Sequence, residues 1–426
     1  MQATGPGVQL DETFAPGPKV GYEPRALTFS HRSSFDSRPN ALTLALIEHA
    51  RVYGNTLLDL TVSNPTEAGI PYDTSSILSA LADPRALVYE PHAFGLSSAR
   101  EAAAREVSEL AGLPVDAADV MLTASTSEAY SFLLKLLCDS GDEVLVPQPS
   151  YPLFEHLAAF EAVRLVPYPL AYDGAWHIDF AALRRAIGPR TRAVLVVNPN
   201  NPTGSFLKRD ELAALAGLGL PIVSDEVFAS YVLEDDPART RSVLETSETL
   251  VFALGGLSKL AALPQMKVAW TVVGGPRAQR REALARLELI ADTFLSVGTP
   301  VQHALPTLLA TRASAHDAIA QRTRANLEAL RTALARAASP ATLLRTEGGW
   351  YATLRLPRTR SEEAWVLDCL EKDHVYVHPG AFFEFSEEAF LVLSLLTPEA
   401  NFAEGVRRIL DRVEERVEGR VSEPVR

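Results

Sequence analysis

Two lysines stand eight residues apart in the apolar stretch GGLSKLAALPQMKVAW (255–270), in a chain whose other basic residues are mostly arginine. Leucine and alanine surround Lys259 in the sequence, and burial among such side chains disfavours the charged ammonium. The neutral amine is a nucleophile towards carbonyl carbon, a role that a guanidinium cannot fill. A lysine that extends its amine from a buried loop to water is the structural alternative. The stretch therefore predicts either carbonyl chemistry at Lys259 or a snorkelling lysine.

An amide and a carboxylate follow two apolar runs that have the composition of strands. VVNPNNPTGS (196–205) places Asn201 in a turn dense in asparagine, proline and glycine, and PIVSDEVFASY (221–231) places Asp225 directly after a strand-like run. Ligands of α/β proteins bind at the carboxyl ends of strands, so both side chains are candidate ligand contacts. An ordinary turn, and a helix N-cap in the case of Asp225, are the alternatives.

Hydroxyl groups and an aromatic ring follow two other strand-like runs. In TASTSEAYSF (123–132), Ser125, Thr126 and Ser127 precede a helical pattern, and their hydroxyls with the backbone N–H groups of a helix N-terminus make an anion site. A Ser/Thr helix cap is the alternative. In PQPSYPLF (147–154), Tyr151 lies on a loop, either as a packed aromatic or as a platform for stacking.

Helical and strand-like segments alternate from about residue 75 to 300 and must position these side chains. The strand-like runs are short, continuous and rich in valine and leucine, which is typical of buried parallel strands joined by crossover helices. Two long helical stretches, three strands and a closing helix follow. The order predicts a large α/β domain with a mostly parallel sheet and then a smaller α+β domain. The predicted strands are 119–123, 142–148, 162–168, 192–200, 221–227, 249–256, 268–275, 350–356, 375–383 and 390–396, and the main helices are 97–112, 127–139, 276–297, 300–337 and 398–418.

Bulk composition excludes several classes of protein. A chain of 426 residues is long enough for two domains, and its net charge of −13 argues against a nucleic-acid or polyanion partner. Cys138 and Cys369 have no metal-ligand spacing, and we expect two buried thiols rather than a disulfide. The N-terminus lacks the pattern of a secretory signal, and no apolar run has the length of a membrane span. We expect a cytoplasmic protein without a metal site.

These motifs gather five groups at one sheet edge: a lysine, a carboxylate, an anion site, an aromatic ring and an amide. A pyridine ring that carries an aldehyde, a phosphate and a phenolic oxygen requires these groups. In these motifs, and in their order from about residue 55 to the C-terminus, the chain resembles the class I/II aminotransferases, which are fold type I pyridoxal-phosphate enzymes. The resemblance implies a sheet of the seven-stranded type. It also implies a segment 25–60 that packs with the small domain, a cofactor domain at 61–300 and a small domain at 301–426. Residues 1–24 are rich in glycine and proline and are expected to form a flexible N-terminal arm.

The resemblance also assigns roles. Lys259 would form the internal aldimine, Asp225 would keep the pyridine nitrogen protonated, Asn201 would bond the phenolic oxygen, and Tyr151 would stack on the ring. Tyr89, in YEPHAFGLSSARE, resembles a tyrosine that reaches the phosphate of the neighbouring subunit, which implies a homodimer with composite sites. The remaining expected cofactor contacts are Ser125, Thr126, Ser127, Phe228, Ser258 and Lys267.

Several positions depart from the family pattern around the cofactor. Lys267 stands where a phosphate-binding arginine is usual, so the charge is kept and the bidentate fork is lost. Phe228 replaces a tyrosine whose hydroxyl usually bonds the phenolic oxygen, and Gly256 replaces a frequent phosphate-binding serine. With one donor fewer, the pKa of the aldimine is expected to be raised unless Tyr231 takes over the bond.

The substrate side departs more strongly. In FLVLSLLTPEANFAEGVRRI (390–409), Val392 stands where the family has an arginine that grips the substrate α-carboxylate. Either another cation supplies this contact or the substrate lacks an α-carboxylate. Ser63 stands where a substrate-contacting glycine is common, its neighbour Asn64 is a candidate substrate contact, and Trp350 either walls the pocket or packs in the core. Candidate replacement cations are Arg32, Arg38, His92 and Arg355, with plain surface charge as the alternative for the first two.

The function predicted on this basis is an aminotransferase that works in two ping-pong half-reactions on an amino acid and a 2-oxo acid, with Lys259 as the proton shuttle. A neutral or hydrophobic amino acid is favoured, because ADTFLSVGTP (291–300) offers no arginine for a side-chain carboxylate. A lyase or decarboxylase with the same cofactor is the alternative. A non-catalytic regulator is disfavoured because the lysine, aspartate and asparagine are all present.

Overall fold

The computed structural model describes residues 28–35 and 38–421. Residues 28–35 belong to a separate short unit, in which the described element is the 3-10 turn η1 (His31–Ser33). The N-terminal arm expected at 1–24 lies outside the described residues. All further elements belong to the unit that residues 38–421 form.

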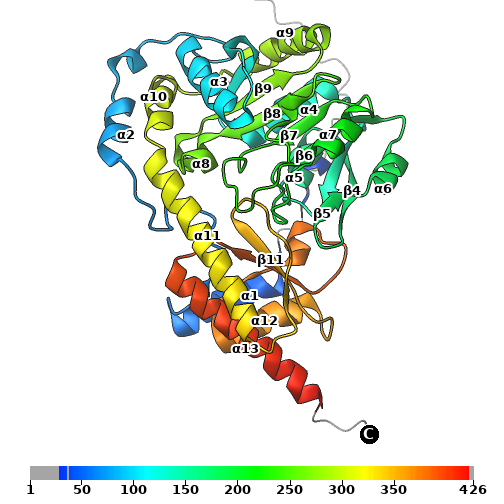
Figure 1. Ribbon diagram of the computed structural model, residues 1–426. Coiled ribbons are helices and arrows are strands. Elements are labelled where there is room, and N and C mark those ends of the chain that lie inside the picture. Colours follow the sequence, from blue (N-terminus) through cyan, green and yellow to red (C-terminus); the bar gives the residue numbers. More distant parts are fainter. Residues whose placement is uncertain (1–27, 36–37, 422–426) are drawn as a thin grey trace, which may run out of the picture. The chain divides into compact units, whose positions relative to one another are not determined.

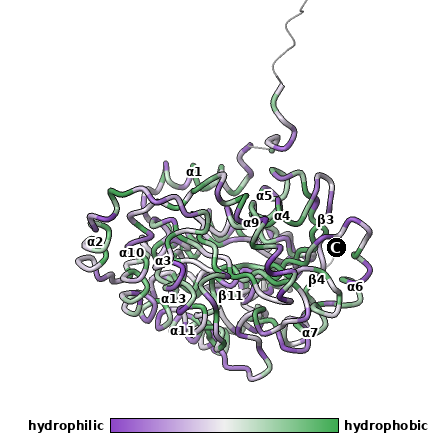
Figure 2. Tube along the Cα trace, turned by 90° about the horizontal axis from the view of Figure 1, so that it is seen from above, coloured by the Kyte–Doolittle hydropathy of each residue, from purple (hydrophilic) through white to green (hydrophobic). Residues whose placement is uncertain are grey.

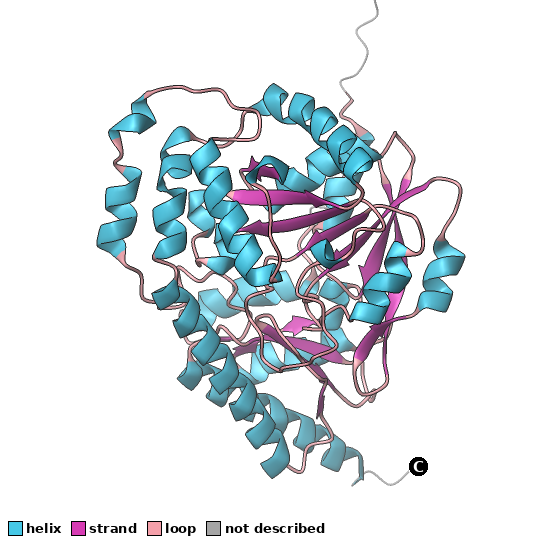
Figure 3. Cartoon of the chain, turned by 45° about the horizontal axis from the view of Figure 1, so that its top comes forward, coloured by secondary structure: helices cyan, strands magenta, loops and turns pink. Residues whose placement is uncertain are grey.

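An eight-stranded sheet, in the order β2-β9-β8-β7-β6-β3-β4-β5, forms the centre of the α/β part (Figure 3). Its middle strands β8, β7, β6, β3 and β4 pair in parallel. The predicted mostly parallel sheet is thereby confirmed, and each segment predicted as a strand between 119 and 275 contains one. The strands are β2 (Val120–Thr123), β3 (Glu143–Gln148), β4 (Arg164–Tyr172), β5 (Trp176–Ile178), β6 (Thr191–Val197), β7 (Ile222–Asp225), β8 (Val251–Gly256) and β9 (Ala269–Gly274).

Two features of this sheet differ from the sequence prediction. β9 runs antiparallel to both of its neighbours, β8 and β2, although its composition resembles that of the parallel strands. The connection 257–268 holds only α8 (Leu257–Leu260) and η5 (Pro264–Met266), which is too short for a regular crossover helix. The short strand β5 was not predicted, and it pairs antiparallel with the end of β4.

Helices cover both faces of the sheet, so its strands are buried on both sides. Alternate strand residues form one core cluster with α3, α6, α7 and α10, and the others form a second cluster with α4, α5 and α9. The tube in Figure 2 changes between green and purple within single helices such as α3 and α7, as expected of helices with one packed and one solvated face. The helices are α2 (Thr74–Leu81), α3 (Ser97–Ala111), α4 (Thr126–Leu137), α5 (Phe154–Phe160), α6 (Phe180–Ala186), α7 (Arg209–Ala216), α9 (Arg277–Phe294) and α10 (Thr299–Ala310), and short 3-10 turns are η2 (Pro84–Leu87), η3 (Ala117–Asp119) and η4 (Val243–Glu245).

The C-terminal part has its own sheet and core. Four antiparallel strands take the order β10-β11-β14-β13, and β1 pairs in parallel with β12. Leu42 and Leu60 from the N-terminal side share one core cluster with residues from α11, α12, α13 and these strands. The elements are α1 (Ala41–Tyr53), β1 (Leu58–Asp59), α11 (Ala313–Arg336), β10 (Thr342–Leu343), β11 (Tyr351–Arg355), α12 (Glu362–Asp373), β12 (Val375–Tyr376), β13 (His378–Pro379), η6 (Gly380–Phe383), β14 (Phe390–Ser394) and α13 (Glu399–Val421).

The long helix predicted at 300–337 is two helices. The chain breaks between α10 and α11 at Thr311 and Arg312, and the Arg312 guanidinium is held by Glu106 of α3, with 2.6 Å between Nη2 and Oε1. This contact, which joins segments far apart in the sequence, is not visible in a helical periodicity. Beyond the break, α11 extends from the region of α8 to α1, α12 and α13 (Figure 1).

Both cysteines are free thiols. Cys369 is buried as expected, whereas Cys138, just after α4, is only half-buried. Burial raises the pKa of each thiol to about 12, so neither is a ready nucleophile. Among the described residues, no helix combines the length and the apolar character that crossing a membrane requires.

Candidate active site

A cavity of about 300 Å³ lies at the carboxyl ends of the parallel strands, and we call it the lysine cavity. β2, β3, β6, β7 and β8 each end at or just before one of the residues expected to hold the cofactor, which is the usual ligand-binding edge of an α/β sheet. The structure therefore brings together side chains from segments between residues 125 and 267, and ten of the predicted site residues line the cavity. These are Ser125, Thr126, Ser127, Tyr151, Asn201, Asp225, Phe228, Ser258, Lys259 and Lys267.

Lys259 lies on the single-turn helix α8 and carries its amine in an aromatic environment. Its Nζ is 4.9 Å from the ring centroid of Trp350 and 5.4 Å from that of Phe228. Desolvation lowers the pKa of the amine from 10.5 to about 8, although the Asp225 carboxylate acts in the opposite direction. A substantial fraction of the amine is therefore neutral near physiological pH, as a nucleophile towards carbonyl carbon requires.

Asp225 ends β7 and is buried beneath the cavity. Desolvation raises the pKa of its carboxyl group to about 6, against hydrogen bonds and the Lys259 charge that lower it. The Tyr130 hydroxyl donates to Oδ2 at 3.1 Å, and the Val227 backbone N–H donates to Oδ1 at 3.2 Å. The sequence analysis missed Tyr130; its place one helical turn after Thr126, on the face that packs on the sheet, was the available signal. These two donors fix the carboxylate at the cavity.

The hydroxyl cluster lies at the N-terminus of α4. Ser125 caps the helix, and its Oγ accepts a hydrogen bond from the Glu128 backbone N–H at 3.1 Å. The capping alternative is therefore correct for this residue, but it leaves the Ser125 hydroxyl proton free to donate. Ser127 and Thr126 line the same cavity, so first-turn N–H groups and hydroxyls face one region. The arrangement suits a dianionic phosphate.

Lys267 faces the cavity from η5, as the residue that ends it. Its side chain is exposed, and its backbone is left-handed, with φ 54° and ψ 51°. A phosphate-binding serine at position 256 would be crowded. A Cβ there would lie 3.1 Å from both Ala269 Cβ and the Val268 carbonyl oxygen. The absence of a serine at 256 thus has a packing reason.

The loop that carries Asn201 is anchored to the C-terminal part through its backbone. The Gly204 carbonyl accepts hydrogen bonds from the N–H groups of Glu347 at 3.1 Å and Gly348 at 2.9 Å. Gly204 has φ +71°, and a Cβ there would lie 2.6 Å from Thr346 Cγ2 and 2.7 Å from the Gly348 carbonyl oxygen. Both the conformation and the space therefore demand glycine at this position.

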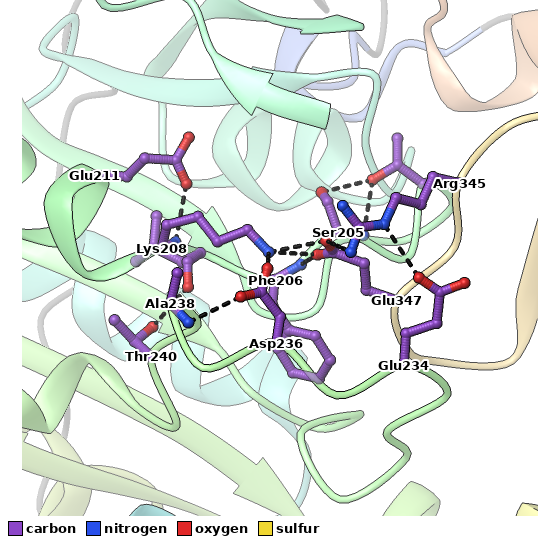
Figure 4. Close-up of polar contacts among 12 residues, drawn as sticks. Ser205, Phe206, Lys208, Glu211, Glu234, Asp236, Ala238, Thr240, Arg345 and Glu347 are labelled. Atoms are coloured by element: carbon purple, nitrogen blue, oxygen red, sulfur yellow. Dashed lines mark hydrogen bonds and ion pairs between the residues drawn. The ribbon is translucent and has the colours of Figure 1, made fainter. Parts of the chain in front are cut away.

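A buried charge network reinforces this anchor (Figure 4). Lys208 Nζ lies 2.8 Å from the carboxylates of both Glu347 and Asp236, and the Glu347 side chain is only 4% exposed. Glu347 also accepts the Phe206 backbone N–H at 3.0 Å, and Arg345 lies 3.4 Å from its other oxygen. Because Glu347 is fully paired, it holds the segment after Asn201 against the strand-rich C-terminal part.

Tyr231 does not reach the lysine cavity. Its hydroxyl donates to the backbone carbonyl of Lys259 at 2.8 Å, and its ring is 1% exposed. The possibility that Tyr231 replaces the hydroxyl missing at Phe228 therefore finds no support in this arrangement. Phe228 packs against Trp350, with ring centroids 5.2 Å apart.

Five predicted contacts do not line the lysine cavity. Trp350 is fully buried behind Lys259, and Val392 is 1% exposed in the middle of β14, paired with Thr353. Tyr89 is 72% exposed and lines a different, smaller cavity. The Asn64 side chain closes its own turn, with Oδ1 accepting from the Thr66 hydroxyl at 2.8 Å. Arg32 lies in the separate unit 28–35, whose position relative to this cavity is not defined.

The cations that line the lysine cavity, within the described ranges, are Lys259 and Lys267. Neither Arg355, which is exposed at the end of β11, nor His92, which lies 3.6 Å from Glu90, is part of the lining. No arginine from residues 38–421 thus faces this space.

The sequence analysis also missed one wall of the cavity. Tyr351 begins β11 and lines the cavity from the C-terminal part, next to Ser63. Desolvation raises the pKa of the Tyr351 hydroxyl, Tyr151 raises it further, and a hydrogen bond with Ser63 lowers it. An alternating strand pattern does not reveal which of its residues meets a second sheet, so the sequence carried no clear signal.

The donor set fits pyridoxal phosphate. The Asn201 side chain lines the cavity, and its buried Oδ1 atom, an acceptor, has no hydrogen-bond partner among the described residues, so an added group that donates would satisfy it. The hydroxyl cluster at α4 matches a phosphate, and the amine of Lys259 and the carboxylate of Asp225 match an aldehyde and a pyridinium. Within residues 28–35 and 38–421, no group of His, Cys, Asp or Glu is arranged to hold a metal ion.

Related sequences are named aminotransferases. The chain is 29% identical over 261 residues to the glutamate-pyruvate aminotransferase AlaA of Escherichia coli (strain K12), a match that covers 60% of this chain and 64% of that protein. The match therefore spans less than two thirds of that relative. The alanine aminotransferase of Mycobacterium bovis is 28% identical over 370 residues, with 84% of this chain and 85% of that protein covered.

Solved structures share the fold. The alanine aminotransferase from Pyrococcus furiosus superposes with a TM-score of 0.81 at 22% identity, over 91% of this chain and 100% of that one. An aminotransferase from Escherichia coli gives a TM-score of 0.77 at 23% identity, over 92% and 99% of the two chains. The family profile "Aminotransferase class I and II" matches residues 56–409, which include every residue that lines the lysine cavity. The chain therefore belongs to the class I and II aminotransferase family.

Proposed function

We propose that the protein is a pyridoxal-phosphate-dependent aminotransferase that moves an amino group between a neutral or hydrophobic amino acid and a 2-oxo acid in two ping-pong half-reactions. The observation that carries this proposal is the pairing of a desolvated lysine with a buried carboxylate in one cavity: Lys259 with a pKa of about 8 and Asp225 with a pKa of about 6. Perturbed groups of this kind in a cavity are typical of catalytic sites.

Bound in the lysine cavity, pyridoxal phosphate would supply an aldehyde for capture of amines and a ring that accepts the electron pair left when a Cα–H bond breaks. Asp225 would hold a proton on the ring nitrogen, because a buried carboxylate is stabilised by an adjacent cation. Asn201 would donate to the phenolic oxygen, and Tyr151 would stack on the ring. Ser125, Thr126, Ser127, Ser258 and Lys267 would bind the phosphate.

Lys259 would move the proton at the substrate. The pKa of its free amine is about 8, so near neutral pH the amine can both accept a proton from Cα and return it. Trp350 and Phe228 lie against the amine and exclude water from it.

The substrate class rests on the lining of the cavity. Tyr151, Phe154, Phe228 and Tyr351 offer aromatic surface, and the described lining has no arginine for a second carboxylate. One relative is named for alanine, which agrees with the neutral class, and another is named for glutamate and pyruvate, of which glutamate carries a second carboxylate. The α-carboxylate would be bound by Lys267, which lines the cavity, or by Arg32 of the separate unit 28–35.

A homodimer with composite sites and a cytoplasmic location are part of the proposal. Tyr89 is 72% exposed and lies outside the lysine cavity of its own chain, as a residue that serves a neighbouring subunit would. Size-exclusion chromatography with light scattering measures the oligomeric state, and a monomer would contradict this part.

The test is a panel of single amino acids added to the cofactor-loaded protein without a 2-oxo acid. We expect neutral and hydrophobic amino acids to convert the cofactor to its pyridoxamine form, with the matching 2-oxo acid released in equal amount. Subsequent addition of a 2-oxo acid should restore the original absorbance. Release of ammonia or carbon dioxide without the pyridoxamine form would instead favour the alternative, a lyase or decarboxylase.

A further inference from the structure

A second cavity, of about 270 Å³, is lined by Ala229 and Ser230, the residues that follow Phe228, and we call it the arginine cavity. It sits at the break between α10 and α11, against α3. It shares no lining residue with the lysine cavity. Its lining is Glu109, Leu110, Phe206, Ala229, Ser230, Val232, Arg239, Arg241, Leu260, Arg312 and His316.

Three guanidinium groups face this cavity, and two of them lack a carboxylate partner among the described residues. Arg312 is paired with Glu106 at 2.6 Å. The Arg239 guanidinium lies over the Phe206 ring at 4.9 Å and makes no ion pair there, and the exposed Arg241 side chain makes none either. One carboxylate of the lining, Glu109, is exposed to solvent. Positive charge is therefore in excess.

The acidic groups next to the lining are occupied elsewhere: Glu245 Oε1, for example, accepts the Arg241 backbone N–H at 2.6 Å and forms no ion pair with the guanidinium among the described residues. Asp317, next to His316, is 80% exposed and lies 3.4 Å from the His316 Nδ1 atom, on the side away from the unpartnered Nε2 atom. Glu106 is already paired with Arg312. The remaining charge at Arg239 and Arg241 calls for an anion.

Three buried polar atoms of the lining have no hydrogen-bond partner among the described residues: Ser230 Oγ, Arg239 Nη1 and His316 Nε2. Each of them can donate a hydrogen bond. Buried donors without partners are rare in folded proteins, and three around one cavity mark a position where an acceptor belongs. Water could satisfy the hydrogen bonds but would leave the guanidinium charge without a counterion.

We propose that the arginine cavity binds a small oxyanion, a phosphate or carboxylate group, between Arg239, Arg241, Ser230 and His316. Guanidinium groups bind both kinds of oxyanion through paired, charge-assisted hydrogen bonds, and the hydroxyl and imidazole supply further donors. The volume exceeds what one water molecule needs many times over, so it admits an organic anion as well as inorganic phosphate.

Tyr231 connects this site to Lys259. Its ring stacks on His316 with centroids 4.7 Å apart, and its hydroxyl donates to the Lys259 carbonyl oxygen. Leu260, the next residue after Lys259, is part of the arginine cavity lining. An anion bound to His316 would thus be linked to Lys259 through the stacked Tyr231 ring and the Tyr231 hydroxyl.

The experiment is isothermal titration calorimetry of the full chain saturated with pyridoxal phosphate, with inorganic phosphate or glutarate as probe and chloride at matched ionic strength as reference. We expect one of the two probes to bind, and the tighter one identifies the group that the site prefers. Arg239→Gln and Arg241→Gln should each weaken binding at least about tenfold, since each removes a charge-assisted hydrogen bond. Arg241 is exposed, so its replacement carries little risk to folding.

Two control variants locate the binding. Arg286→Gln changes an exposed arginine of α9 that is paired with Glu282, and it should leave binding as in the parent. Lys267→Gln changes the exposed lysine of the lysine cavity, so it removes only anion binding that belongs to that cavity and should leave the binding that Arg239 and Arg241 support. Loss of binding in Lys267→Gln with retention in both arginine variants would place the anion in the lysine cavity and overturn the proposal, as would a parent protein that binds neither probe.

Discussion

The lysine cavity and the arginine cavity have similar volumes, of about 300 and 270 Å³, and successive residues of one short segment line them. Val227 and Phe228 line the first, while Ala229 and Ser230 line the second. The lysine cavity contains amines beside a buried carboxylate, and the arginine cavity contains guanidinium groups of which two lack a carboxylate. The first is equipped to form and break covalent bonds, and the second only to bind charge.

The difference shows how one backbone segment supports two kinds of chemistry. A lysine changes protonation state when it is desolvated, whereas an arginine keeps its charge in the same surroundings. The cation type at each cavity therefore sets what it can do. Exchanging lysine for arginine in one cavity and arginine for lysine in the other is the most direct test of this difference.

Lys259→Arg should have the largest effect. It keeps a positive charge but removes the only amine on α8, and we expect turnover to fall at least about a thousandfold. Reduction with borohydride in the presence of pyridoxal phosphate should label Lys259 in the parent and nothing at that position in the variant. The reciprocal exchange, Arg239→Lys, should leave turnover within about twofold and weaken anion binding by only about threefold to tenfold. Equal turnover of Lys259→Arg and parent would refute the covalent role.

Asp225→Asn should have the next largest effect and sharpens the description of the lysine cavity. Turnover should fall by about a hundredfold or more, since no carboxylate remains to hold the ring proton. In the cofactor-free parent, trinitrophenylation of Lys259 should rise with pH to half its maximum near pH 8, because only the neutral amine reacts.

The same variant tests whether the Asp225 carboxylate raises or lowers the pKa of the Lys259 amine. Above pH 6 the Asp225 carboxylate is largely charged and favours the ammonium form of Lys259, so its removal should move the labelling midpoint to lower pH. Peptide mapping by mass spectrometry reports Lys259 separately from the exposed Lys267. A midpoint that moves to higher pH would contradict the assignment.

Tyr231→Phe should have the smallest effect, and it separates the two cavities. It removes one buried hydrogen bond to the Lys259 carbonyl, which also accepts the Ala262 backbone N–H at 3.2 Å, so the loss should be about 1 kcal/mol and lower Tm by about 1–2 °C. The spectroscopic pKa of the cofactor-loaded protein should stay unchanged, because the hydroxyl does not face the lysine cavity. A shifted spectroscopic pKa would show that Tyr231 does take over the bond missing at Phe228.

The strand ends of the large sheet and the lining of the lysine cavity could be predicted from the sequence because they depend on local order. Buried parallel strands have short apolar runs, and the polar residue after each run meets the same edge of the sheet. Lys259, Asp225 and Asn201 are found in this way. The antiparallel direction of β9 was not predictable from composition, because a buried strand has the same residues in either direction.

Contacts between distant segments were beyond a reading of local pattern. Tyr130 and Tyr351 reach the site from a helix face and from a second sheet, and no spacing in the chain joins them to Asp225 or Tyr151. The arginine cavity was even less predictable from local pattern. Its cations come from separate loops and from the helix break at Arg312, so each of them resembles ordinary surface charge until the fold is known.

Position 204 has a consequence for engineering. Its glycine sits in a left-handed conformation with the neighbouring 346–348 segment in contact, so even a methyl group has no room. Libraries that aim to broaden the choice of amino donor therefore gain nothing from randomising this codon, although it lies only three residues from Asn201. Ser63 and Tyr351 are better positions to randomise, because both line the lysine cavity and neither is a glycine in a left-handed conformation.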